Sequence, residues 1–170
     1  MPNAPTALFR KLNGFVAMTG EETARLTEVL SKRVSVKGGQ ELLQEGHYGH
    51  KVFIIQTGWA SSYKDLSDGG RQIISFSLPG DCVGLRSVLL KTADHSFSAL
   101  TDSELKTIVA VPLIRMFDDY PRIRSGFLWS AARDEAMAVE HLVSVGRRSA
   151  LERTAHFFME LAERLMLVGL

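Results

Sequence analysis

Apolar and polar residues alternate over short stretches in the middle of the chain, and glycine repeatedly separates these stretches. The segments RVSVK, KVFIIQT, WASSYKDL and RQIISFSL recur from Arg33 onward at intervals of about 8 to 12 residues, and SFSALT and LKTIVAV continue the series. Asp68-Gly69-Gly70 favours a hairpin because glycine tolerates the positive φ of tight turns. The pattern predicts a mainly β fold with helices, an antiparallel double-stranded β-roll of the jelly-roll type at about 33–111.

Helical spacing flanks the predicted roll on both sides. Thr19-Gly20-Glu21-Glu22 has the spacing of a capping box, which predicts a short helix, and another helical turn is expected around Leu8 to Leu12. Beyond Pro121 we expect one long helix to about Val145. Gly146 interrupts that pattern, and the capping box Ser149-Ala150-Leu151-Glu152 predicts a further helix that ends at Gly169.

Two lines of mostly apolar residues follow the long helix with the alternating spacing of a coiled coil. We expect one line to cover the roll and the other to meet a second chain, which predicts a homodimer. The alternative is that both lines are buried within one subunit, and the sequence leaves open which line faces which partner. The line taken as the dimer interface is Leu128, Ala131, Glu135, Ala138, Leu142 and Val145, and the second line is Trp129, Ala132, Ala136, Val139 and Val143.

The final predicted helix also carries an apolar face, and that face needs a covering surface. Its members are Leu151, Ala155, Phe158, Leu161, Ala162 and Leu165. Because the sequence stops a few residues later, we expect it to end inside a second domain.

The composition restricts the class of protein. The chain has 170 residues, of which 45% are hydrophobic, and its 20 basic and 19 acidic side chains leave a net charge of +1. This balance gives no strong overall field for nucleic acid or membrane. Apolar runs are far shorter than the roughly 20 residues that span a bilayer, so we expect a cytoplasmic protein with no membrane contact. The single cysteine, Cys82, provides too few thiolates for an iron–sulfur cluster, and none is expected.

The order of these elements resembles the Crp/Fnr family of bacterial transcription regulators. The matching motifs are QEG followed by VFIIQTG, the turn LPGDCVG, and GRRSALERTAHFFMELAERL from Gly146 to Leu165. The resemblance implies a cyclic-nucleotide-binding-like sensor domain at 1–120 and a dimerisation helix at 121–146. It assigns 147–170 to the hinge and the first helix of a winged helix-turn-helix domain, with hinge residues Gly146, Arg147, Arg148 and Ser149. It also implies a homodimer that binds DNA through the rest of that domain and contacts RNA polymerase.

The turn within LPGDCVG is a candidate site for an anion or effector. Glycines permit close approach, and the N–H groups of such a turn can surround negative charge. The candidate residues are Gly80, Asp81, Cys82, Val83 and Gly84, with His95 and Ser96.

The resemblance argues against cyclic AMP as the ligand of this turn. It implies a G-E-x-G cassette and a later Arg-Ser or Arg-Thr pair on the phosphate, whereas this sequence has Asp81 and then Asp94-His95-Ser96-Phe97. A neutral histidine replaces arginine poorly. Arg86 has a different spacing from Asp81, and we expect it to be a surface residue. The alternatives are a tight turn kept for folding and a site for another anion or small effector.

Other function classes are weighed against the regulator hypothesis. A stand-alone cyclic-nucleotide-binding-like domain that regulates a partner protein is the main alternative. A cupin-like metal enzyme would use His47 and His50 with His95, but a solvated loop explains these histidines and no metal site is predicted. No nucleophile elbow, Walker loop or dinucleotide fingerprint occurs, so we predict that the chain is not an enzyme. Cys82 could be a redox-sensitive thiol or a small buried hydrophobe.

Overall fold

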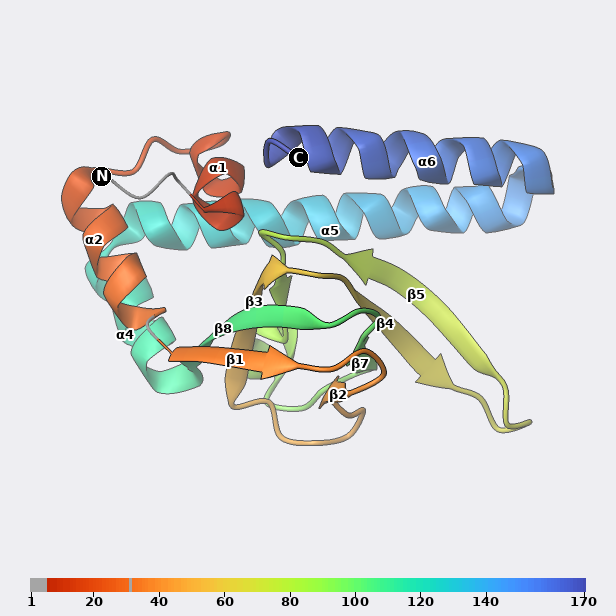
Figure 1. The fold of residues 1–170 in the computed structure, drawn as a ribbon, viewed down its shortest axis with the longest axis horizontal. Helices are drawn as coiled ribbons and strands as arrows, with labels where there is room; N and C mark the ends of the chain where they lie inside the picture. The colour runs from red at the N-terminus through yellow and green to blue at the C-terminus, as the bar shows by residue number, and fades with distance from the viewer. Residues whose placement is uncertain (1–5, 31) are drawn as a thin grey trace.

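Two antiparallel four-stranded sheets form a roll at the centre of the computed structural model, which describes residues 6–30 and 32–170 (Figure 1). One sheet has the order β1-β8-β3-β6 and the other the order β2-β7-β4-β5. The predicted antiparallel β-roll with flanking helices is therefore confirmed. The strands are β1 (Lys32–Val36), β2 (Glu41–Leu43), β3 (Lys51–Thr57), β4 (Ala60–Asp65), β5 (Arg71–Ser77), β6 (Cys82–Val83), β7 (Ser96–Ala99) and β8 (Ser103–Val109).

Strand β3 separates two hydrophobic cores. Successive side chains of a strand point to opposite faces of the sheet. Ile55 accordingly belongs to the core inside the roll, with Val83 and Leu105, whereas Ile54 belongs to the core that the helices cover. Both isoleucines are completely buried, which is why KVFIIQT is apolar without strict alternation.

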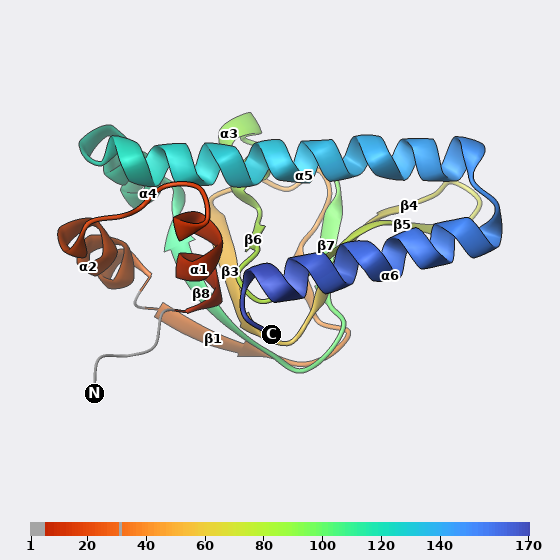
Figure 2. The ribbon, with the colours of Figure 1, turned by 90° about the horizontal axis from the view of Figure 1, so that it is seen from above.

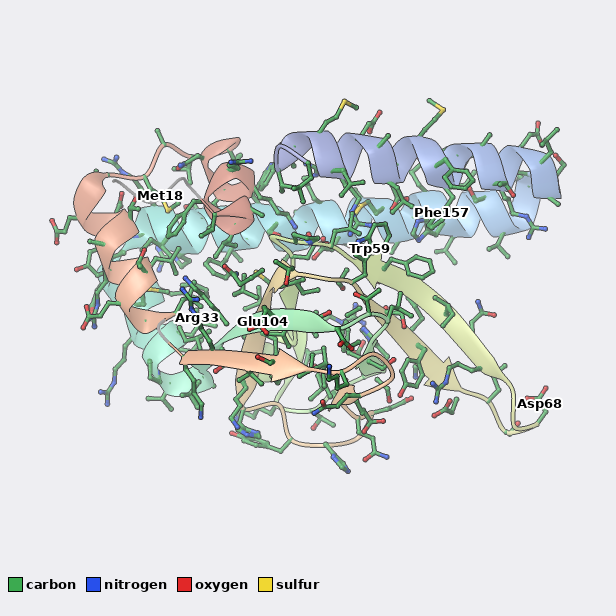
Figure 3. All side chains as sticks on the ribbon, in the orientation of Figure 1. Met18, Arg33, Trp59, Asp68, Glu104 and Phe157 are labelled. Carbon is green, nitrogen blue, oxygen red and sulfur yellow. The ribbon has the colours of Figure 1, made fainter. Side chains whose placement is uncertain are left out.

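The β4–β5 hairpin turns where the sequence predicts it. Leu66 donates its N–H to the carbonyl of Gly70 at 2.8 Å, and the Asp68 carboxylate accepts the N–H of Gly70 at 2.9 Å. Asp68 lies at the far tip of the hairpin (Figure 3). Gly69 has a φ of +84°, the positive value from which the glycine was taken to predict a hairpin turn there.

Helices α1, α5 and α6 lie along one side of the roll, and α2 and α4 lie at one end of it (Figure 1). Helices α5 and α6 are antiparallel to each other (Figures 1 and 2). Both predicted capping boxes are present, at Thr19 for α2 and at Ser149 for α6. Within the described residues, no helix combines the length and hydropathy needed to cross a membrane. The helices are α1 (Ala7–Asn13), α2 (Gly20–Val29), α3 (Leu85–Leu90), α4 (Ala110–Asp119), α5 (Pro121–Arg147) and α6 (Ala150–Leu167).

Candidate functional site

The turn between β5 and α3 is closely covered by its own chain. Gly80 has a φ of +92°, and a Cβ there would lie 2.9 Å from the backbone of Ala7 in α1. Gly84 precedes α3 with a φ of +88°, and its Cβ would lie 2.9 Å from the carbonyl oxygen of Lys51. Both glycines therefore accommodate neighbouring protein backbone, which favours the role of a turn needed for folding.

The carboxylate of Asp81 is bound by groups from three parts of the chain. Its Oδ1 lies 2.7 Å from the Nζ of Lys11 on α1. Its Oδ2 accepts the N–H of Leu78 at 2.8 Å and a guanidinium N–H of Arg164 on α6 at 2.6 Å. Lys11, Asp81 and Arg164 are here called the Asp81 cluster. An anion at this turn would meet a carboxylate whose cationic partners are already engaged.

Electrostatic shifts agree with this arrangement. Burial alone would raise the pKa of Asp81, but attraction to Lys11 and Arg164 lowers it below its usual value. Burial likewise opposes the charged form of Lys11, and attraction to Asp81 outweighs it, so the pKa of Lys11 is raised. The cluster is therefore an internal ion network whose charges persist at neutral pH.

Cys82 follows Asp81 and is a half-buried residue packed against the hydrophobic core. Desolvation by burial raises the pKa of its thiol to about 12. Its strand, β6, pairs with β3, where Cys82 lies opposite Ile54. A thiol that stays protonated at neutral pH is a poor nucleophile, so the geometry favours a packing role over redox sensing.

A small hollow beside the cluster is too small for an effector. It is lined by Lys11, Asp81, Asp134 and Arg164, among others, and has a volume of about 10 Å³, the space of about one water. Desolvation around the cluster raises the pKa of Asp134 to about 6, although the residue as a whole is exposed to solvent. The hollow is a packing feature of the α5–α6 contact.

His95 and Ser96 have partners other than the turn. The Nδ1 of His95 lies 3.0 Å from the Oδ1 of Asp94, and its ring centroid lies 4.6 Å from that of Phe97. Burial lowers the pKa of His95, which keeps the ring neutral at physiological pH. The hydroxyl of Ser96 accepts the N–H of Glu45 at 2.9 Å. The two groups of candidate residues thus make separate contacts, the turn with α1 and α6, and His95 and Ser96 with the β2–β7 region.

Helix α5 buries a third line of residues that sequence periodicity did not identify. Ile123, Phe127, Ser130 and Ser144 are buried in the single chain. The expectation that one of the two apolar lines covers the roll is wrong. Burial of both lines within one subunit is also excluded, because the first line is 58% exposed at Leu128 and 74% exposed at Leu142, and Val139 and Val143 of the second line are exposed too. The other members of the first line are exposed as well: Ala131, Glu135, Ala138 and Val145.

The predicted hinge is a short break between two well-capped helices. Helix α5 continues through Gly146 to Arg147, so the helix does not end at the glycine. Arg148 bonds back to Glu140 at 3.2 Å. Ser149 caps α6, donating its N–H to the Glu152 carboxylate at 2.7 Å. The end of α5 and the start of α6 are therefore each stabilised by contacts of their own at the break.

Helix α6 folds back over the roll, and its buried face differs from the predicted one. Leu161 is buried and Leu165 is half-buried by the same chain. The expectation that a missing domain would cover these two residues is therefore wrong. Phe157, labelled in Figure 3, packs on Phe76 of β5 with ring centroids 5.3 Å apart. The exposed face of α6 consists of Leu151, Ala155, Phe158, Met159, Ala162 and Met166.

Comparison with known families assigns this architecture. A family model described as the cyclic nucleotide-binding domain matches residues 33–120, just over half of the chain. The chain belongs to the cyclic nucleotide-binding domain family. The match coincides with the roll and the helix α4 that follows it.

The relatives of this cyclic nucleotide-binding domain are Crp/Fnr-type transcription regulators, as the sequence motifs predict. The nitrogen fixation regulation protein FixK of Rhizobium meliloti (strain 1021) is 35% identical over 128 residues, which cover 75% of this chain and 56% of that protein. FixK of Bradyrhizobium diazoefficiens is 31% identical over 141 residues, covering 82% and 58%. The structure of FixK2 from Bradyrhizobium japonicum is similar with a TM-score of 0.73 and 29% identity, over 78% of this chain and 66% of that one. The chain thus spans a little more than half the length of these curated relatives.

The loop after α3 contains an ion pair that sequence reasoning missed. Arg86 on α3 forms a salt bridge with Asp94, in the loop where the resemblance places the phosphate-binding arginine. Helix α3 has no acidic residue in its first turn. A carboxylate therefore lies where the resemblance leads us to expect a positive charge, and it is paired with Arg86. Their spacing of eight residues was readable from the sequence, but the contact depends on how the loop after α3 returns to β7.

Metal chemistry has no assembled ligand set in the part of the chain that the structure describes. There, no three His, Cys, Asp or Glu side chains come together in a way that could hold an ion. The rings of Tyr48 and His50 instead stack on each other with centroids 6.4 Å apart. The loop containing His47 and His50 therefore offers no support for the cupin-like alternative.

Proposed function

We propose that this chain is the effector-sensing and dimerisation part of a bacterial DNA-binding transcription regulator of the Crp/Fnr type. In this proposal, residues 1–120 form the sensor domain, 121–146 the dimerisation helix, and 147–170 the hinge with the first helix of the DNA-binding domain. The protein acts by binding and conformational change and not as an enzyme. DNA, and RNA polymerase where it is contacted, are partners of the longer regulator.

The observation that carries this proposal is the exposed apolar surface of α5. Leu128, Leu142 and Val145 are each more than half exposed. The same 27-residue helix is held in the sensor domain near its start, by Ile123, Phe127 and Ser130. Long exposed apolar faces on helices mark interaction surfaces. The coiled-coil spacing supports a second copy of the same helix as the partner, in a two-fold symmetric dimer. A stand-alone regulatory domain would not need the hinge and the separately capped α6.

DNA binding tests the proposal directly. The natural longer protein should bind a two-fold symmetric duplex with half-sites about one helical turn apart. The 170-residue chain alone should fail to shift the same duplex at physiological salt, because 146–170 carries only four arginines against three glutamates and offers one helix. Electrophoretic mobility shifts with both proteins and a scrambled duplex provide the measurement. Sequence-specific binding by the short chain would show that the DNA-reading element is misplaced, and a longer protein that binds no duplex would favour the stand-alone domain.

Cyclic AMP is expected to bind this chain weakly or not at all. A phosphate entering the loop after α3 would face Asp94, and Arg86 could reach it only by giving up that carboxylate. A bound phosphate would thus lack the arginine that the resemblance expects, and loss of one member of a desolvated charge pair costs about 2–5 kcal/mol. Titration calorimetry should detect no low-micromolar binding, and Asp94→Asn, which frees Arg86, should bind more tightly than the native chain. Low-micromolar affinity of the native chain would contradict this expectation.

A further inference from the structure

Two positive side chains lie directly opposite each other on the outer face of strands β1 and β8. Arg33 on β1 is in register with Lys106 on β8, and the two are here called the β1–β8 cation pair. Lys106 is also in register with Ile54 of β3, which belongs to the core under the helices, so this face points out of the roll. Neither cation takes part in any ion pair formed by residues 6–30 and 32–170. Because like charges directly opposite each other destabilise an antiparallel pair, this position favours a bound negative group.

The two cations differ in a way that suits an oxyanion. Lys106 is half-buried, and both this burial and the charge of Arg33 lower its pKa. No carboxylate in the described part of the chain offsets these two effects. Arg33 is exposed and can offer a guanidinium, whose planar N–H donors match the oxygens of a phosphate. One ammonium and one guanidinium can thus bind the same phosphate group from two neighbouring strands.

A polar groove begins two residues further along the same face. Ser35 and Glu104, each two residues from a member of the cation pair, are in register with each other. Residues two apart on a strand share a face and lie roughly 7 Å from each other. Both residues line a groove with a volume of about 290 Å³, which is close to the size of small-molecule sites. The other residues that line it are almost all polar: Val36, Lys37, Gln40, Thr57, Asp102 and Ser103.

The free carboxylate of this groove is that of Glu104, which is labelled with Arg33 in Figure 3. The carboxylate of Asp102 is engaged by the ammonium of Lys37 at 2.6 Å, whereas Glu104 forms no ion pair with residues 6–30 and 32–170. An ionised carboxylate accepts hydrogen bonds and repels anions. The groove therefore suits hydroxyl groups, and the phosphate of a ligand is directed to the cation pair.

From this arrangement we propose that the outer face of β1 and β8 is a ligand site for a small phosphorylated polyol, such as a sugar phosphate. The phosphate lies between Arg33 and Lys106, and the hydroxyl groups lie in the groove beside Glu104. Strand β3 separates this site from β6 and the turn before it, so the site is distinct from the candidate effector turn. The inference goes beyond the proposed role in DNA binding.

Titration calorimetry at constant ionic strength tests the proposal with glucose 6-phosphate, inorganic phosphate and glucose. Glucose 6-phosphate should bind about tenfold or more tightly than inorganic phosphate, and glucose should not bind detectably. Arg33→Gln and Lys106→Gln should each weaken binding of glucose 6-phosphate by about tenfold or more. Lys64→Gln is the matched control, because Lys64 pairs with Glu45 and lies on the other sheet, and it should bind as the native chain does.

Thermal unfolding of the same proteins separates lost binding from lost folding. Without ligand, Lys106→Gln should unfold at the same temperature as the native chain or at a higher one, because a repulsion is removed. Glucose 6-phosphate should raise the Tm of the native chain and of Lys64→Gln but not that of Lys106→Gln. Glu104→Gln should keep the affinity for inorganic phosphate and lose most of the preference for glucose 6-phosphate.

Four results would each overturn the proposal. They are no binding of glucose 6-phosphate at millimolar concentration, equal affinities in the native chain and both cation variants, binding of inorganic phosphate with no preference for the sugar phosphate, and binding of hexaglutamate in place of both phosphates. The third result would mean an adventitious ion only, and the fourth would indicate a surface for an acidic protein. None of these measurements involves DNA or the α5 interface, so the outcome is independent of the tests of the proposed function.

Discussion

Replacing Leu142 with glutamate is expected to convert the protein from a dimer to a monomer. Leu142 is 74% exposed in the single chain and is the fifth of the six residues in the first apolar line on α5. Two-fold symmetry would place the new carboxylate in the interface twice, where it is desolvated without a partner. A well-packed apolar contact is worth on the order of 2 kcal/mol or more, so dimer affinity should fall by at least about 30-fold. Sedimentation or light scattering measures the change.

Matched substitutions identify the interface. Ala138→Glu in the same line should also give monomer, whereas Val139→Glu in the second line should leave the dimer if the first line forms the contact. Leu151→Glu makes the same chemical change on α6, at a residue that is 80% exposed, and should leave the mass unchanged. If both Leu142→Glu and Ala138→Glu remain dimeric, the interface lies elsewhere.

The sequence predicted the elements of this fold well where local chemistry determines them. Ser149 with Glu152, and Thr19 with Glu22, satisfy backbone donors within one turn, so the helix starts follow from four neighbouring residues. The glycines of the β4–β5 hairpin act in the same local way. The order of strands within the two sheets was not predicted, because it depends on pairing between segments far apart in the sequence, such as β1 with β8.

The buried face of α5 could not be predicted from hydrophobicity because part of it is not hydrophobic. Ser130 and Ser144 are buried there, and Gly126 lies against Leu12 of α1, where a larger residue would crowd the contact. The two lines predicted from the helical spacing are more strongly apolar, and both are mainly exposed. Periodicity reports that a helix has an apolar face, but whether that face meets the same chain or another depends on the tertiary structure.

The Asp81 cluster was missed for a different reason. Its three charged residues lie in α1, in the turn before β6 and in α6, and Asp81 and Arg164 are 83 positions apart in sequence. In the sequence, each of the three residues by itself looks like an ordinary charged residue of a protein surface. The fold-back of α6 adds Arg164 to the Lys11–Asp81 pair. It also buries Leu161, which belongs to the face expected to meet a missing domain.

Replacing Asp81 with asparagine should lower the free energy of unfolding more than any other substitution proposed for this chain. The change preserves size but leaves the buried Lys11 without its anion and Arg164 with Glu160 alone, and breaking a buried pair in this way costs about 3–5 kcal/mol. Thermal and urea unfolding followed by circular dichroism measure it. Asp102→Asn is the matched control, because Asp102 pairs with Lys37 at an exposed site, where solvent screens the attraction and little stability should be lost.

The pH dependence of that loss identifies charge as its cause. Because the pKa of Asp81 is lowered in the folded state, its stabilising contribution is present above the unfolded value near 3.8 and is lost as pH falls through the folded pKa. The difference in unfolding free energy between the native chain and Asp81→Asn should therefore be constant near neutral pH and shrink below about pH 4. Asp134, whose pKa is raised to about 6, contributes in the opposite direction, so both proteins are also compared in an Asp134→Asn background. A difference that persists unchanged to strongly acidic pH would mean that Asp81 acts through its shape and its bond to Leu78, and not through the ion network.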